Sequence, residues 1–159
     1  MPDCLLRHAV KKDMAVIARM MDEFNSYLAS IDGRVPEIEM SIVEEKLIEA
    51  GFGPTAKFRA AVAEIDGEPV GYSIYSIGFW AEPLVGVVEL SDLFVRESWR
   101  SKGIGEKLMA FLAEVGREEA CRKIRWTVWT RNEGAKRFYQ RLGAEVVEEE
   151  ETMVLAIPE

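Results

Sequence analysis

The chain has 159 residues, of which 48% are hydrophobic and 30% are charged, and this composition is typical of one globular domain with a sizeable core. The net charge of −8 disfavours nucleic acid as a partner, because phosphate binding needs a basic face, and it suits a cationic ligand. No apolar run approaches the roughly 18 residues of a membrane span, and the first residues do not follow a signal-peptide pattern. We therefore expect a cytoplasmic protein that does not enter membranes.

Two cysteines far apart in the chain do not indicate a disulfide framework. His8 is the only histidine, so a zinc site built from Cys and His is not expected, and we predict no metal.

The first half of the chain predicts three strands and two helices, and the last two strands form a hairpin. Met14, Ile17, Met20, Met21 and Phe24 recur at helical spacing and indicate an amphipathic helix with one apolar face. Asp66-Gly67 is the strongest hairpin signal. In chain order we expect a strand around residues 5–7, a helix over 11–27, a loop over 30–36, a helix over 37–50, and paired strands over 58–64 and 70–77.

The second half alternates between strands and helices. We expect a connection over 78–86, a central strand over 87–95, a helix over 103–120, a strand over 124–129, a helix over 132–142, and a final hairpin of 144–148 with 152–157. The mixture predicts an α/β fold of three layers: a mixed, mostly antiparallel sheet of about six to seven strands, flanked by about four helices. Residues 1–159 read as a single domain, without a linker or an internal repeat.

The segment from Glu89 to Gly105 carries the clearest functional signal. A short apolar strand passes through a polar turn into Arg100-Ser101-Lys102-Gly103-Ile104-Gly105, and a helical pattern follows at once. Glycines let a backbone approach a ligand closely, and the first N–H groups of a helix have no partner within that helix. With the positive charges of Arg100 and Lys102, the segment predicts a site for a pyrophosphate.

Two familiar phosphate motifs do not fit this segment. A P-loop requires a lysine directly after its second glycine, and a dinucleotide-binding turn requires a third glycine where this chain has Leu108. The pattern Arg-x-x-Gly-x-Gly instead resembles the acyl-CoA signature of the GNAT acetyltransferase superfamily. A second segment, 132–143, with an Asn, a helix carrying Phe138-Tyr139 and a final Leu-Gly, is similar to the segment after the fifth strand of that superfamily. The resemblance covers nearly the whole chain, and Gly51-Phe52-Gly53 and Ser91-Asp92-Leu93-Phe94-Val95 make it closest to the diamine (spermidine/spermine) acetyltransferase branch.

The resemblance implies an N-acetyltransferase that moves an acetyl group from acetyl-CoA to a primary amine of a small molecule by direct attack. It implies that backbone groups around the end of the central strand pair with the pantetheine arm and that the glycine turn holds the pyrophosphate. The implied acetyl-CoA residues are Leu93, Phe94, Val95, Arg100, Ser101, Lys102, Gly103, Ile104, Gly105, Asn132, Lys136 and Tyr139.

Tyr139 is the expected general acid, because a phenol keeps its proton at neutral pH and can give it to a departing thiolate. The base is an open question. The diamine branch carries a Glu-Asp pair at the positions of Ser91-Asp92, and here the Glu is replaced. Strand alternation places Glu89 on the face of Ser91 and Asp92 on the other face, unless a bulge intervenes, so Glu89 is the expected base. Further candidate acceptor contacts are Phe24, Tyr27, Trp80, Glu82, Ser91 and Asp92.

Two alternatives remain open at this point. The chain could be a catalytically idle acyl-CoA-binding or sensor domain of the same fold, or a nucleotide-binding module that uses the same glycine turn. We also expect a homodimer, because members of this family often pair through late strands and 152–157 offers an apolar edge.

Overall fold

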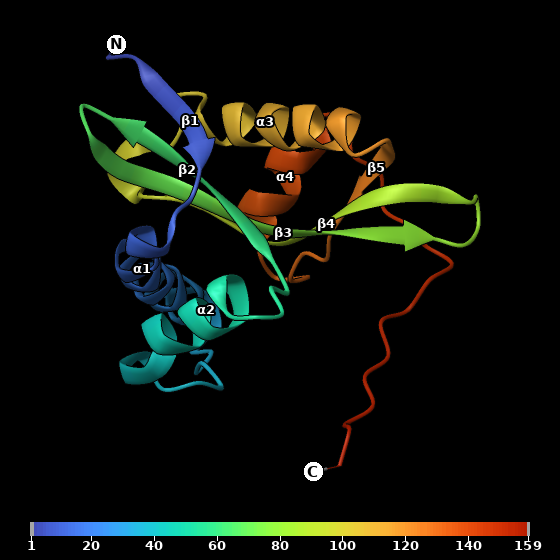
Figure 1. The fold of residues 1–159 in the computed structure, drawn as a ribbon, viewed down its shortest axis with the longest axis horizontal. Helices are drawn as coiled ribbons and strands as arrows, with labels where there is room; N and C mark the ends of the chain where they lie inside the picture. The colour runs from blue at the N-terminus through green and yellow to red at the C-terminus, as the bar shows by residue number, and fades with distance from the viewer. Residues whose placement is uncertain (1, 159) are drawn as a thin grey trace. The chain divides into compact units, whose positions relative to one another are not determined.

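The computed structural model describes residues 2–158 (Figure 1). Their contacts divide into two compact units, one ending at Thr127 and one beginning at Val128. The first unit holds a five-stranded sheet with three α-helices, and the second holds one α-helix, α4 (Glu133–Arg141). Among residues 2–158, no helix combines the length and the apolar character that crossing a membrane requires.

The sheet is mixed, as the sequence predicts. Its strands lie in the order β1 (Cys4–His8), β2 (Arg59–Ile65), β3 (Glu68–Trp80), β4 (Val85–Val95) and β5 (Cys121–Arg125). The first four strands pair antiparallel, and β5 runs parallel to β4. The hairpin between β2 and β3 turns at Asp66-Gly67 with positive φ at both residues, 51° and 83°, which confirms the predicted two-residue turn.

The prediction of six to seven strands is wrong, because the described residues form five. The missing pair is the expected hairpin of 144–148 with 152–157, which has no strand in residues 144–158. Met153, Val154 and Leu155 are each more than 90% exposed. A strand needs a neighbour for its backbone N–H and C=O groups, and this apolar segment finds none within the described chain.

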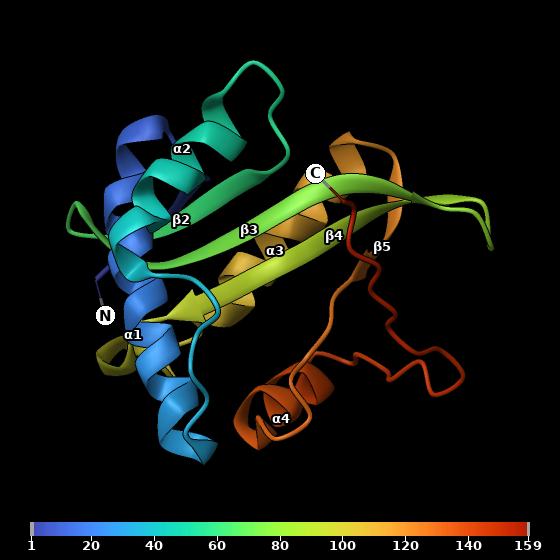
Figure 2. The same ribbon diagram turned by 90° about the horizontal axis from the view of Figure 1, so that it is seen from below.

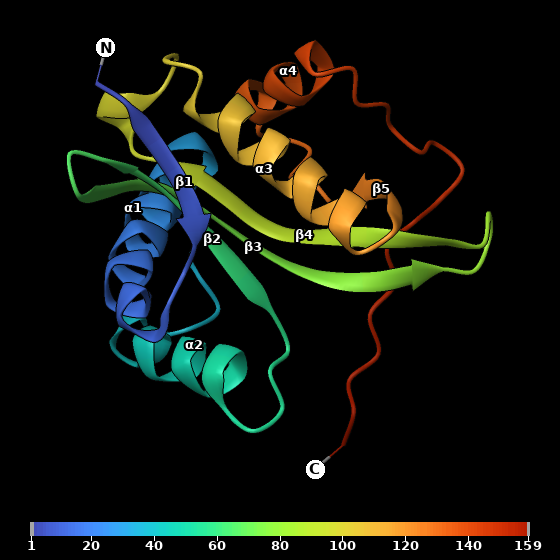
Figure 3. The ribbon, with the colours of Figure 1, turned by 45° about the horizontal axis from the view of Figure 1, so that its top comes forward.

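Helices cover both faces of the sheet in the first unit. Figures 2 and 3 show α1 (Met14–Asp32) and α2 (Val43–Phe52) on one face and α3 (Ile104–Glu118) on the other. Together with α4 this makes the four predicted helices, and short 3-10 turns precede α1, α2 and α3. The first unit is therefore a three-layer α/β arrangement.

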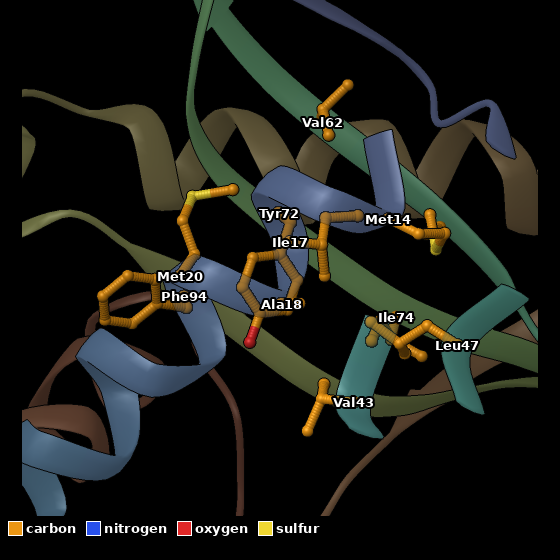
Figure 4. Close-up of a cluster of buried hydrophobic side chains, with 11 residues drawn as sticks. Met14, Ile17, Ala18, Met20, Val43, Leu47, Val62, Tyr72, Ile74 and Phe94 are labelled. Atoms are coloured by element: carbon orange, nitrogen blue, oxygen red, sulfur yellow. The ribbon is translucent and has the colours of Figure 1, made fainter. Parts of the chain in front are cut away.

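The core beneath α1 is built from the predicted apolar stripe. Met14, Ile17 and Met20 are fully buried and pack against Tyr72 of β3 and Phe94 of β4 (Figure 4). The same cluster includes Val43 and Leu47 of α2. The strand residues of this cluster therefore lie on the face of the sheet that α1 and α2 cover. Even-numbered residues of β3, such as Tyr72 and Ile74, point to this face, and we call it the α1/α2 face.

Candidate active site

The glycine turn leads into α3 as predicted. A 3-10 turn (Glu97–Trp99) follows β4, Ser101 and Gly103 adopt positive φ of 58° and 77°, and α3 begins at Ile104. Gly103 is the N-cap and supplies no side-chain cap, and the Lys107 N–H donates to the Gly103 carbonyl at 3.1 Å. The N–H groups of the first helical turn have no hydrogen-bond partner within the helix, and such groups suit an anion.

The two positively charged side chains of the turn, Arg100 and Lys102, contact neighbouring residues of the first unit. The Arg100 Nε donates to the Val95 carbonyl at 2.9 Å, and its guanidinium carbon lies 4.6 Å from the Tyr27 ring centroid and 5.4 Å from that of Phe94. Lys102 donates to the Ser98 carbonyl at 3.0 Å and lies over the Trp99 ring. Arg100 thus fastens the turn to the end of β4 and to α1.

One edge of β4 is open beside this turn. The ladder to β5 covers Gly86 to Glu89, and within residues 2–158 no strand pairs with residues 90–95 on that side. The N–H and C=O groups there can pair with an extended ligand as a strand would. This is the stretch that contains Leu93, Phe94 and Val95.

A β-bulge sits in β4 at Ser91. Ile74 of β3 lies opposite Asp92, and the next residue, Tyr75, lies opposite Leu90, so Ser91 is the extra residue. A bulge shifts the alternation of side chains by one residue. The prediction that Glu89 and Asp92 occupy different faces is therefore wrong: both point to the α1/α2 face.

The face of Glu89 is fixed by its neighbours. A Cβ added to Gly78, an even-numbered residue of β3, would meet the Glu89 side chain at 3.2 Å. Glu89 is bound by Arg125 of β5: Nε donates to Oε2 at 3.2 Å and Nη2 donates to Oε1. The Arg125 guanidinium carbon lies 4.9 Å from the Trp80 ring centroid. Trp80, Arg125 and Glu89 thus form one partly exposed charged cluster beyond the bulge.

Asp92 lies at the edge of an apolar layer. The Tyr72 hydroxyl donates to its Oδ2 at 2.6 Å. Burial raises the pKa of Asp92 above its ordinary 3.8, and hydrogen bonds from Tyr72 and from the Leu93 N–H act in the opposite direction. Burial, and then the nearby carboxylate, raise the pKa of Tyr72 well above 10, so its phenol keeps its proton. The pair is a desolvated carboxyl with a fixed donor.

The candidate acceptor residues are partly brought together. Phe24 packs 5.4 Å from Phe94, and Tyr27 lies under Arg100, so both surround the end of β4 on the α1/α2 face. Trp80 joins Glu89 through Arg125. Glu82 lies exposed in the turn between β3 and β4, and Ser91 is exposed at the bulge.

The second unit carries the remaining predicted residues on α4. Asn132 is the N-cap of α4, and its side chain accepts the Ala135 N–H at 3.1 Å. Lys136 pairs with Glu133 at 3.0 Å, and Tyr139 packs against Phe138 with ring centroids 5.0 Å apart. Gly143 follows with a φ of 85°, which confirms the predicted glycine after the helix.

Comparison with known proteins identifies the family of this chain. The model of the Acetyltransferase (GNAT) family matches residues 18–144. Thialysine N-epsilon-acetyltransferases of Bos taurus and Sus scrofa are 32% and 33% identical to the chain, over 92% and 95% of it and 87% and 89% of those proteins. An integron cassette protein from the mobile metagenome of V. cholerae superposes with a TM-score of 0.76 at 25% identity, over 96% of this chain and 92% of that one.

The chain belongs to the GNAT acetyltransferase family. It is an acetyltransferase that transfers an acetyl group to an amine, and enzymes of this family use acetyl-CoA as the acetyl donor. The relationship to the thialysine enzymes is consistent with the predicted diamine acetyltransferase branch. Among residues 2–158, no group of three or more His, Cys, Asp or Glu side chains is placed to hold a metal ion.

The sequence reasoning missed Arg125 and Tyr72. Arg125 was part of a predicted strand, but only the parallel register of β5 places it beside Glu89. Tyr72 reads as an ordinary aromatic strand residue, and its contact with Asp92 depends on the pairing of β3 with β4. A local pattern carries no signal for either contact, because each joins residues of different strands.

Proposed function

We propose that this enzyme transfers the acetyl group of acetyl-CoA directly to the primary amine of a small molecule, with the acceptor on the α1/α2 face. The observation that carries this proposal is the uncapped N-terminus of α3 directly beyond the open edge of β4. A pyrophosphate and an extended amide-containing arm are the two ligand parts that these backbone groups suit.

The residues present fit acetyl-CoA. Backbone N–H groups at residues 101–105 suit the pyrophosphate, and those of Leu93 to Val95 suit the pantetheine arm and the thioester carbonyl. When bound there, acetyl-CoA supplies the acetyl group. On the sequence pattern of α4 we further propose that Asn132 and Lys136 contact the donor and that Tyr139 protonates the departing thiolate.

A cationic acceptor suits the acidic side chains of the α1/α2 face. Glu89 and Asp92 both point there, and Phe24, Tyr27 and Trp80 offer aromatic surface to an alkyl chain or an ammonium. The relatives named for thialysine acetylation support thialysine and similar side-chain amines as one acceptor class. The resemblance of the sequence to the diamine acetyltransferase branch suggests polyamines as a second class.

The test is release of free CoA thiol from acetyl-CoA with a panel of amines that includes thialysine, lysine, ornithine and spermidine. We expect release that depends on one or more of these amines. An enzyme that binds CoA and acetylates none of them would instead be an acyl-CoA-binding domain. Displacement of CoA by ATP or NAD at equal concentration would favour a nucleotide-binding module.

We further propose that the protein forms a homodimer through residues 152–157. This extended segment exposes Met153, Val154, Leu155 and Ile157, each by more than 90%, and a second copy is a suitable partner for such a segment. Sedimentation equilibrium at high micromolar concentration should give the dimer mass, and a monomer mass there would exclude this assembly.

A further inference from the structure

Tyr72 and Asp92 form a polar pair inside the aromatic layer between α1 and the sheet. Tyr72 is fully buried and lies near Phe94 in the cluster drawn in Figure 4. Its ring centroid lies 6.1 Å from that of Phe94, which in turn lies 5.4 Å from that of Phe24. An ionisable carboxyl beside such a layer costs folding free energy, because its charged form is poorly solvated. The neighbouring cluster that includes Tyr72 and Phe94 also holds Met20, Ala18 and Val43, which offer this carboxyl no hydrogen bond.

The carboxyl is held in one orientation. Tyr72 donates to Oδ2 at 2.6 Å, and the Leu93 N–H donates to the same group. Asp92 lies opposite Ile74 of β3 and two residues before Phe94, so it points to the α1/α2 face, next to the open edge of β4. Asp92 as a whole residue is partly exposed, while its carboxyl is desolvated beside the apolar layer.

Glu89 is less suited to accept a proton. Both of its oxygens accept N–H groups of Arg125, and protonation would disrupt this ion pair. Asp92 pairs with a neutral phenol instead.

We propose that Asp92 takes the proton of the acceptor ammonium and that Tyr72 is the residue that positions its carboxyl for this step. The inference rests on the proposed amine acetylation. One N–H bond of the ammonium breaks, and its proton goes to the carboxylate of Asp92 and later to solvent. The freed electron pair forms the C–N bond at the thioester carbonyl, and the C–S bond breaks. The thiolate takes up one proton, and the nitrogen loses its second proton to solvent.

The electrostatic surroundings suit this role. Burial makes Asp92 a stronger base than an exposed aspartate, while the Tyr72 hydrogen bond limits how far its pKa rises. α2 contributes apolar Val43 and Leu47 to this face. The charged groups around this face are arranged in pairs or over aromatic rings: Glu89 with Arg125, Glu23 of α1 with Arg96, and Arg100 over Tyr27 and Phe94.

Tyr72→Phe tests the pairing, because it removes one hydroxyl and keeps the ring. Without that donor the ionised Asp92 loses stabilisation, so its pKa rises further. The acid limb of the kcat/KM profile against pH should move about 1–2 pH units to higher pH for the first amine that the wild type acetylates. An NMR titration of carboxyl-labelled aspartate should show the same upward shift for the resonance that Asp92→Asn removes.

Tyr75→Phe is the matched control. Tyr75 is equally buried on the same strand but points to the α3 face, where its hydroxyl lies 3.3 Å from the His8 Nδ1. This variant should keep both the wild-type pH profile and the Asp92 titration. Calorimetric titration with CoA should give the wild-type affinity for both tyrosine variants. An unchanged affinity shows that the variants are folded.

Asp92→Asn should lower kcat/KM at pH 7 by about 100-fold or more, the usual worth of a general base. A Tyr72→Phe profile that superimposes on the wild-type profile would overturn the positioning role. An Asp92→Asn enzyme with wild-type kcat/KM would overturn the whole inference. Both results require a wild type that acetylates an amine, whereas a wild type without turnover would count against the proposed function itself.

Discussion

Replacing Arg100 with lysine separates the geometry of the glycine turn from its charge. The guanidinium makes one hydrogen bond to the Val95 carbonyl at 2.9 Å and lies over two aromatic rings, those of Tyr27 and Phe94. Lysine keeps the positive charge but cannot reproduce the planar fork that makes these contacts together.

The magnitude follows from those contacts. A hydrogen bond from a charged donor contributes about 1.5–3 kcal/mol, and each cation–π contact at a partly exposed site adds about 0.5–1 kcal/mol. Lysine can retain part of the ring contacts, so Arg100→Lys should lower the free energy of unfolding by about 1.5–3 kcal/mol. A loosened turn must also be ordered when CoA binds, so its Kd should rise about tenfold, which corresponds to about 1.4 kcal/mol.

Urea denaturation and calorimetric titration with CoA measure the two effects. Lys102→Gln is the control, because it removes a positive charge from an exposed side chain that contacts the Ser98 carbonyl and the Trp99 ring. It should change stability by less than about 0.5 kcal/mol. If Arg100→Lys matches the wild type while Lys102→Gln loses CoA affinity, charge and not geometry governs the turn, and the reasoning is refuted.

Three further substitutions test other parts of the account. Tyr139→Phe should lower kcat about 10²–10⁴-fold with little change in CoA affinity, and a wild-type kcat would show that the phenol only packs. Glu89→Gln should raise KM for a cationic amine about five- to tenfold and leave the acid limb of the pH profile in place; a displaced limb would return the role of base to Glu89. Asp13→Ala should lower the free energy of unfolding at pH 7 by about 2–4 kcal/mol, because Asp13 is buried and accepts Arg7 at 2.7 Å. The hydrogen bond from Arg7 lowers the pKa of Asp13 below its ordinary 3.8, so the pair stabilises the fold above that pH. The difference between variant and wild type should shrink as pH falls through the lowered pKa, and a constant difference in acid denaturation curves would contradict this sign.

Local patterns predicted most of the fold. The stripe of α1, the Asp66-Gly67 turn and the glycine turn before α3 each depend on neighbours in the sequence, and each has the expected structure. The final hairpin failed because strand propensity in 152–157 does not supply a partner for its backbone.

The candidate site was harder to predict for the same reason. A bulge at Ser91 is one extra residue in one strand, and no residue type there announces it. That single residue reverses the face of Asp92 relative to Glu89, and with it the choice between two bases. The pairing of Glu89 with Arg125 likewise depends on the register between β4 and β5.

The central claim is that the turn before α3 holds an acetyl donor for transfer to an amine. Mass spectrometry of an amine incubated with acetyl-CoA tests it most directly, with wild type and Gly105→Val side by side. A bulky side chain at Gly105 should block the approach of the pyrophosphate to the backbone, while the variant keeps its far-ultraviolet circular dichroism. We predict an acetylated amine and one CoA released per amide with the wild type, and neither with Gly105→Val at a donor concentration that saturates the wild type. Equal product from both proteins, or none from a wild type that binds CoA, would contradict the account.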